Sequence, residues 1–144
     1  MTKPVAVVIG ATSKWQSDGR NTRMIHGGDI PDEELTLSTR WGVGGAIALK
    51  FAREGFHVVL TTRNKPNASA LESAIDSEGF DCMTVELDLE SDDSISTAFE
   101  TIKSQLGDPK VVILNAGYLE GRDLPPGMDL LEHMPVEVFE TAQN

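Results

Sequence analysis

Short apolar runs alternate with segments of helical periodicity along this chain. The four runs are VAVVIG at 5–10, HVVLTT at 57–62, CMTVELD at 82–88 and VVIL at 111–114. Runs of this length that are rich in β-branched residues are typical of strands buried on both faces of a parallel sheet. Helical patterns separate them, so the order is strand, helix, strand. The alternation predicts an α/β fold with a doubly wound parallel sheet and right-handed crossovers.

The helical patterns carry recognisable end signals. The pattern at 91–107 begins with Ser91 as its expected N-cap and ends at Gly107. The pattern at 67–79 has Asn67 as its expected N-cap. The pattern at 43–55 follows a glycine-rich stretch, and a last helix is expected from Pro135, because proline favours the first turn of a helix.

The composition fits one globular domain. The chain has 144 residues, of which 40% are hydrophobic and 24% are charged, and this length supports a single packed core. No apolar run approaches the about 20 residues that cross a membrane. The single cysteine, Cys82, excludes an internal disulfide and fits a reducing cytosol. Together with the absence of a leader-like start, this predicts a cytoplasmic protein without a membrane partner.

Charge is unevenly distributed between the two halves of the chain. The net charge is −11, but residues 1–65 hold 9 Lys and Arg against 6 Asp and Glu, whereas residues 66–144 hold 3 against 17. The acidic total argues against nucleic acid as a partner. The more basic half is the half that a polyanionic small ligand would prefer. The three histidines, His26, His57 and His133, have no metal-ligand spacing, so no metal site is expected.

Two separated stretches look like halves of one phosphate-binding loop. They are VIGATSK at 8–14 and RWGVGGA at 40–46, with a polar insertion at 14–41 between them. When the halves are joined, a first glycine allows the turn, two later glycines let the backbone approach a pyrophosphate, and the following helix start supplies donors. We expect the insertion either to pass over the adenine end of the site, anchored by Trp15 and Trp41, or to be disordered, as its polar composition also allows.

The joined loop resembles that of the short-chain dehydrogenase/reductase family, whose pattern is T-G-x-x-x-G-x-G, with Ile9 in place of the threonine. Three further segments are similar to the family in the same order: FAREGFHVVLTTRN to its second strand, ELDLES to its adenine-contacting segment and ILNAG to its Asn-Asn-Ala-Gly motif. The resemblance implies a Rossmann-type fold. Residues 1–144 would form its N-terminal, cofactor-binding part with four strands, and the C-terminal part would be missing.

The resemblance also implies which residues bind the cofactor. Asp88 would bind the adenine amino group, and the stretch from Asn115 to Gly117 would line the cofactor. The full implied set is Gly10, Thr12, Ser13, Gly42, Val43, Gly44, Arg63, Asp88, Leu89, Asn115, Ala116 and Gly117.

The end of the second strand indicates the type of dinucleotide. An acidic side chain at this point binds the ribose 2′-hydroxyl of NAD, whereas an arginine accommodates the 2′-phosphate of NADP. Thr62 is followed by Arg63 and no acid. NADP(H) is therefore expected in preference to NAD(H), with Lys14 or Arg40 as a second phosphate contact.

The catalytic groups of the family are not found in this chain. In the family, a serine, a Tyr-x-x-x-Lys pair and an asparagine carry the reaction. The only tyrosine is Tyr118, and Arg122 stands where the lysine would be. The serine strand and the catalytic helix are expected beyond residue 144, and Asn144 is the candidate for the asparagine.

The leading hypothesis is an NADP(H)-dependent oxidoreductase of this family, which transfers hydride between the nicotinamide and a carbonyl or alcohol substrate and is a homo-oligomer when complete. The main alternative is a non-catalytic dinucleotide-binding or sensor module. RWGVGGA is also similar to the loop of enoyl-acyl carrier protein reductases, and S-adenosylmethionine binding is a remoter option. The apolar run at 111–114 would form an exposed sheet edge, which is expected to aggregate or dimerise.

Overall fold

A computed structural model describes residues 2–12, 41–117 and 136. Its centre is a four-stranded parallel sheet in the order β3-β2-β1-β4. The strands are β1 (Val5–Ile9), β2 (His57–Thr62), β3 (Cys82–Glu86) and β4 (Val111–Leu114). All four apolar runs therefore form strands, and the predicted α/β fold is confirmed.

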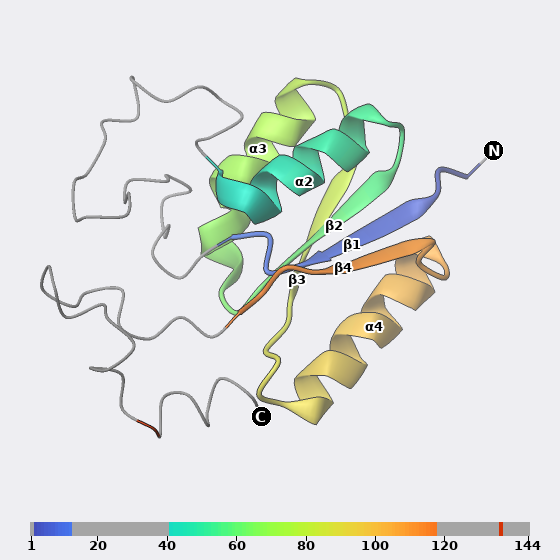
Figure 1. Cartoon of the computed structure of the whole chain (residues 1–144). Helices are drawn as coiled ribbons and strands as arrows, with labels where there is room; N and C mark the ends of the chain where they lie inside the picture. The colour runs from blue at the N-terminus through green and yellow to red at the C-terminus, as the bar shows by residue number, and fades with distance from the viewer. Residues whose placement is uncertain (1, 13–40, 118–135, 137–144) are drawn as a thin grey trace, which may run out of the picture.

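Helices cover both faces of the sheet (Figure 1). α2 (Gly42–Arg53) and α3 (Ser69–Ser77) lie on one face, and α4 (Asp92–Leu106) lies on the other. The chain moves outward from β1 through β2 to β3, and α4 then brings it back to the far side of β1. The strand order thus reverses between β1 and β4. In such sheets, ligands bind beyond the carboxyl ends of the strands at this reversal.

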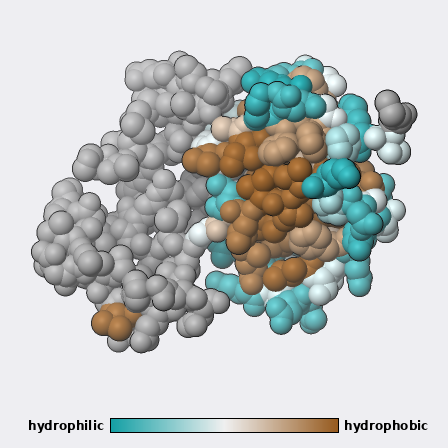
Figure 2. Space-filling view, turned by 45° about the vertical axis from the view of Figure 1, so that its right-hand side comes forward, coloured by the Kyte–Doolittle hydropathy of each residue, from teal (hydrophilic) through white to brown (hydrophobic). Residues whose placement is uncertain are grey.

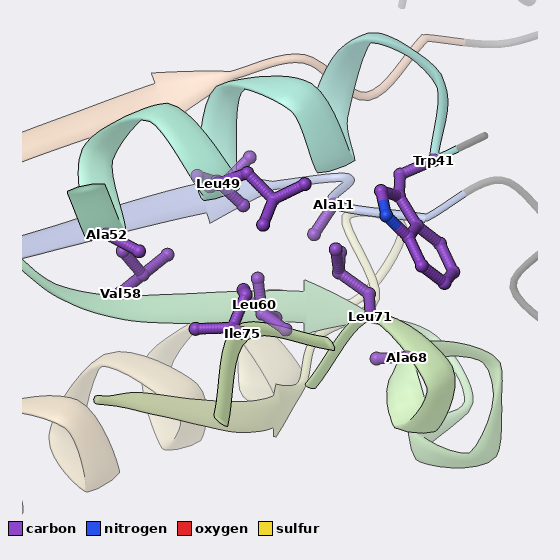
Figure 3. Packing of buried hydrophobic residues seen from close by; sticks show 11 residues of the cluster. Ala11, Trp41, Leu49, Ala52, Val58, Leu60, Ala68, Leu71 and Ile75 are labelled. Carbon is purple, nitrogen blue, oxygen red and sulfur yellow. The ribbon is translucent and has the colours of Figure 1, made fainter. Parts of the chain in front are cut away.

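Alternate residues of the strands build two hydrophobic layers. Val8, Val58 and Leu60 face α2 and α3, and Figure 3 shows part of this cluster. Val7 and Val59 face α4. Because successive side chains of a strand point to opposite faces, the central strands are apolar throughout and contribute to both layers.

Of the two predicted N-cap residues, one is confirmed by the structure and the other is wrong. Ser91 caps α4, its hydroxyl accepting a hydrogen bond from the Ser94 amide, as predicted. The prediction of Asn67 as the N-cap of the second helix is wrong. A 3₁₀ turn, η2 (Lys65–Ala68), precedes α3, and Ala68 is the N-cap residue. The turn begins early because Pro66 stands in its first positions, where a missing amide costs nothing.

Among the described residues, β4 is the outermost strand on one side of the sheet. Val112 and Leu114 on this strand are 49% and 68% exposed, and Figure 2 shows broad hydrophobic surface on the described part of the molecule. Association through this edge stays a prediction. The insertion is described only at Trp41, and the helix expected from Pro135 only at Val136, so both lie almost wholly outside the described residues.

None of the helices described in residues 41–117 is long and apolar enough to cross a membrane.

Candidate functional site

The carboxyl ends of β1 and β4 meet at Gly10. Gly10 has φ 80°, a left-handed conformation that favours glycine. A Cβ atom at this position would lie 2.7 Å from the Ala116 backbone nitrogen and 2.8 Å from its Cα. The amides of Asn115 and Ala116 both donate to the Ile9 carbonyl oxygen, each at 2.9 Å. Gly10 is therefore required both for the turn and for the close approach of the segment that follows β4.

The first turn of α2 packs directly on this junction. A Cβ atom at Gly44 would collide with the Gly10 carbonyl oxygen and would lie 2.8 Å from the Asn115 side-chain nitrogen. Asn115 Nδ2 donates a hydrogen bond of 2.9 Å to the same carbonyl oxygen. Three chain segments thus meet through backbone and one amide side chain. In the structure, Gly44 allows α2 to pack closely on the end of β1. The sequence alone did not distinguish this role from that of letting the backbone come close to a ligand.

The start of α2 has the features of an anion-binding turn. Among the described residues, no side chain caps it, and its first turn contains no acidic residue. Trp41 has φ −92° and ψ −2°, and Gly42 follows with φ 68°. A right-handed residue followed by a left-handed one directs successive backbone N–H groups to one side and forms a concavity that suits an anion. Val43, in the same turn, is 69% exposed.

Two buried threonines tie β2 to the end of β1. Thr61 Oγ1 donates to the Val8 carbonyl oxygen at 3.2 Å and accepts from the Gly10 amide at 3.3 Å. Thr12 Oγ1 donates to Thr62 Oγ1 at 3.3 Å. Both residues stand at the carboxyl end of β2, as the sequence predicts, but their hydrogen bonds to the end of β1 were not expected. Their signal is the pair of hydroxyls that ends the otherwise apolar run HVVLTT.

Arg63 follows Thr62 at the same edge of the sheet and is exposed. The contact between Thr12 and Thr62 places the first residues after β1 beside the start of this Arg63 segment. A cation here is available to a ligand that reaches from the start of α2 past the end of β2.

Asp88 lies at the outer end of this edge, two residues after β3. Its amide donates to Ser94 Oγ at 2.9 Å, and its Oδ1 accepts from the Glu90 amide at 3.1 Å. The segment before it is joined to β2, because the Leu87 amide donates to the Thr62 carbonyl oxygen at 3.0 Å. Leu89, the next residue, is 43% exposed.

The expected site residues thus fall into three groups. One group surrounds Gly10 and consists of Gly10, Gly42, Val43, Gly44, Asn115, Ala116 and Gly117. A second joins Thr12 to the end of β2 and Arg63, and the third is Asp88 with Leu89 after β3. Four other residues, Ser13, Lys14, Arg40 and Asn144, lie outside the described residues.

Cys82 is not suited to nucleophilic chemistry. Burial, with the neighbouring Asp76 carboxylate, raises the pKa of its thiol to about 12. Its sulfur contacts Asp76 Oδ1 at 3.5 Å at the start of β3, at the opposite edge of the sheet from Gly10. Because the thiolate is the reactive form, this cysteine is inert near neutral pH.

Comparisons with known proteins agree with this geometry. The family model for short chain dehydrogenases matches residues 38–140. The chain is 34% identical over 83 residues to a 3-oxoacyl-(acyl-carrier-protein) reductase of Pseudomonas aeruginosa, which covers 58% of this chain and 34% of that protein. It is 37% identical over 79 residues to an acetoacetyl-CoA reductase of Cupriavidus necator, which covers 53% and 31%.

A 3beta-hydroxysteroid dehydrogenase of Mediterraneibacter gnavus is 31% identical over 88 residues, with 60% of this chain and 32% of that protein covered. The chain therefore spans about a third of the length of the curated relatives it matches. Among solved structures, a metagenomic short-chain oxidoreductase in complex with NADP has a TM-score of 0.58 and 27% identity, over 82% of this chain and 41% of that one. By its motifs, its fold and its matched residues, this chain belongs to the short-chain dehydrogenase family.

Proposed function

We propose that this chain forms the NADP(H)-binding part of an oxidoreductase that transfers hydride between the nicotinamide and a carbonyl or alcohol carbon. The observation that carries the proposal is the junction at Gly10, where a Cβ on Gly10 or Gly44 would strike backbone beside an uncapped helix start. Backbone without side chains, next to helix N–H groups that no described side chain caps, suits the approach of a pyrophosphate. The residues present therefore fit a dinucleotide.

Each group of site residues has a part in holding that dinucleotide. The turn from Gly42 to Gly44 would receive the pyrophosphate, together with Thr12 and Ser13. Asp88 would accept a hydrogen bond from the adenine amino group, with Leu89 beside it. Asn115, Ala116 and Gly117 would line the cofactor. The fixed position of Asp88 supports this role, because hydrogen bonds to Glu90 and Ser94 already orient it.

The preference for NADP(H) depends on Arg63. This exposed cation stands directly after β2, where NAD-binding proteins of this fold place an acid. A guanidinium binds phosphate oxygens through two parallel N–H groups, which adds both affinity and geometric selectivity. A 2′-phosphate on the adenosine ribose would meet this group.

The chemistry proposed for the whole protein follows from the cofactor and from the relatives. Bound NADPH would supply the hydride from its nicotinamide. The three curated relatives are named for a 3-oxoacyl group, acetoacetyl-CoA and a 3beta-hydroxysteroid. All three names denote a carbonyl or an alcohol, which supports that class of substrate for this chain. We also propose a homo-oligomer, with the exposed apolar residues of β4 as supporting evidence for association.

Calorimetric titration of the 144-residue chain with NADPH and with NADH tests the proposal. We expect tighter binding of NADPH, and we expect Arg63→Ala to weaken NADPH binding by about tenfold without changing NADH binding, as loss of a charged phosphate contact predicts. Lys110→Ala is the matched control, because it removes an equally exposed positive charge at the opposite edge of the sheet. Equal binding of both dinucleotides would contradict the NADP(H) preference, and no binding of either would contradict the site.

A further inference from the structure

Trp41 occupies an unusual place at the start of α2. It is the N-cap residue of the helix, yet its side chain is only 8% exposed and belongs to the core cluster between α2 and α3. Figure 3 shows the indole beside Ala11 and Leu71, with its nitrogen on the side of the ring that faces Ala11. Helix caps are usually small polar residues that bond the first amides. A buried aromatic ring does not cap the helix in this way, so its role at this position is a different one.

Gly45 leaves room for the base of the Trp41 side chain, where the ring joins the backbone. A Cβ atom at Gly45 would collide with Trp41 Cβ, and it would lie 3.3 Å from Trp41 Cγ and 3.4 Å from Leu71 Cδ2. The two residues are four apart, so a side chain at position 45 would lie on the same face of the helix as that of Trp41. Gly45 is in neither the turn nor the junction at Gly10, and its φ is not in the left-handed region. Its lack of a side chain is explained by the position of Trp41.

The residue that bears the ring, Trp41, is itself the first residue of the anion-binding turn. Trp41 and Gly42 form the right-handed and left-handed pair at the helix start, and Gly44 rests on the Gly10 carbonyl oxygen two residues later. A shift of the Trp41 ring therefore changes the direction of the N–H groups between these two fixed points. Protein interiors are densely packed, so a buried ring of this size has few alternative positions.

We propose that Trp41 is a positioning residue, which wedges against Gly45 and Leu71 and thereby aims the first turn of α2 at the phosphates of the dinucleotide. The inference rests on the proposed function, because it concerns how that site receives its ligand. Trp41 Nε1 is buried without a hydrogen-bond partner among the described residues. The ring consequently acts through its shape, and an aromatic ring without the N–H group should replace it.

Variants on both sides of the contact test the wedge. Titration with NADPH should show affinity reduced by about tenfold or more in Gly45→Ala, since the added methyl group must displace the ring or the turn. Trp41→Phe should keep the affinity within about threefold, and Trp41→Leu, which lacks the ring, should lose more. Gly55→Ala is the control, because it adds a methyl group in the turn after the same helix, where no atom lies within 4 Å of the new Cβ. Its affinity should equal that of the wild type.

Amide NMR spectra of the same proteins separate this inference from the proposed function. Gly45→Ala should move the resonances of Trp41 and of the turn from Gly42 to Gly44, whereas Gly55→Ala should not. If the wild type binds no NADPH but these resonances move, the proposed function fails, and of the inference only the packing of Trp41 against the turn stands. If the wild type binds NADPH and Gly45→Ala binds equally well, the wedge is overturned. Equal losses in Trp41→Phe and Trp41→Leu would also overturn it, because the N–H group and not the shape would then matter. If Gly45→Ala does not fold, the two Trp41 variants decide.

Discussion

The side of the sheet where the strands end (the carboxyl edge) and the side where they begin (the amino edge) are built from different interactions. At the carboxyl edge, Gly10, Gly44 and Asn115 meet through backbone contacts and uncharged hydrogen bonds. At the amino edge, charged side chains dominate. Lys3 pairs with Asp81 at 2.6 Å, and Arg53 pairs with Glu78 at 2.7 Å where α2 and α3 end. Within residues 2–12 and 41–117, the ion pairs gather at the edge away from the candidate site.

This difference indicates where the fold tolerates change. In three ion pairs of the amino edge the side chains are about half exposed or more, and such pairs contribute little to stability because water screens them. The Arg53–Glu78 pair is the exception, because it has two hydrogen bonds and Glu78 is only 33% exposed. At the carboxyl edge, backbone atoms occupy the volume that a single methyl group would need. Substitutions there should affect both stability and ligand binding, whereas those at the amino edge should affect neither strongly.

Gly10→Ala should give the largest effect. The new methyl group would be strained by the positive φ and would strike the Ala116 backbone, so we expect the free energy of unfolding to fall by about 3 kcal/mol. Gly55→Ala is the matched control, with φ 87° and no atom within 4 Å; it should lose only about 1 kcal/mol. Chemical denaturation measures both. Equal losses would show that backbone conformation alone, and not the close approach, requires Gly10.

Asn115→Ala removes the one side-chain hydrogen bond to the Gly10 carbonyl oxygen that the described residues make. We expect a loss of about 1.5 kcal/mol in the free energy of unfolding, since a half-buried acceptor loses its donor. NADPH affinity should fall as well, because this bond holds β4 against the start of α2. Stability unchanged in urea titrations would indicate that the backbone bonds to Ile9 suffice.

Ser91→Ala tests the outer part of the carboxyl edge. The Ser91 hydroxyl caps α4 through the Ser94 amide at 3.2 Å, and Ser94 in turn holds the Asp88 amide. Loss of an N-cap should lower stability by about 1 kcal/mol. Thermal unfolding measures this change. Ser91→Asp should restore it, because aspartate is an equally good cap.

The smallest effect is a pH dependence at the amino edge. Burial lowers the pKa of His57 below its usual 6.5, although Asp81 opposes this and Lys3 adds to it. The unfolded chain therefore takes up this proton at higher pH than the folded chain, and the stability that neutral His57 contributes is lost as pH falls below 6.5. His57→Gln should flatten the stability profile between about pH 7 and pH 5.

The carboxylates at this edge titrate in a separate range. Their ion-pair partners lower the pKa values of Asp81 and Glu78 below 3.8 and 4.5 respectively. Their contribution is therefore present above those values and lost only in more acidic solution. A profile for His57→Gln identical to that of the wild type would assign any loss near neutral pH to other groups.

The strands and helix stops could be predicted because their signals are local. VVIL and HVVLTT form the predicted strands, and Gly107, with φ 89°, ends α4 as expected. The prediction of Asn67 as an N-cap was wrong because Pro66, the residue before it, favours a 3₁₀ turn at this point. Two local signals compete there, and that of the proline prevails.

The site could be predicted only in part. Gly10 and Asn115 were expected in the same cofactor site, but their direct contact was not. The roles of Thr61, Thr62 and Gly45 were not expected either, since a hydroxyl or a missing methyl group has no periodic pattern. Assignment of all these residues to a dinucleotide stays a prediction.

The sequence by itself determined the order of strands and helices, the positions of the glycines and the likeness to one family, because each depends on neighbouring residues. The tertiary structure decided which distant residues meet. Asn115 reaches Gly10 across a separation of 105 residues, and Thr62 reaches Thr12 across 50. Only the order β3-β2-β1-β4 brings such pairs together, since the reversal at β1 places the end of β4 and the start of α2 against the same carbonyl oxygen.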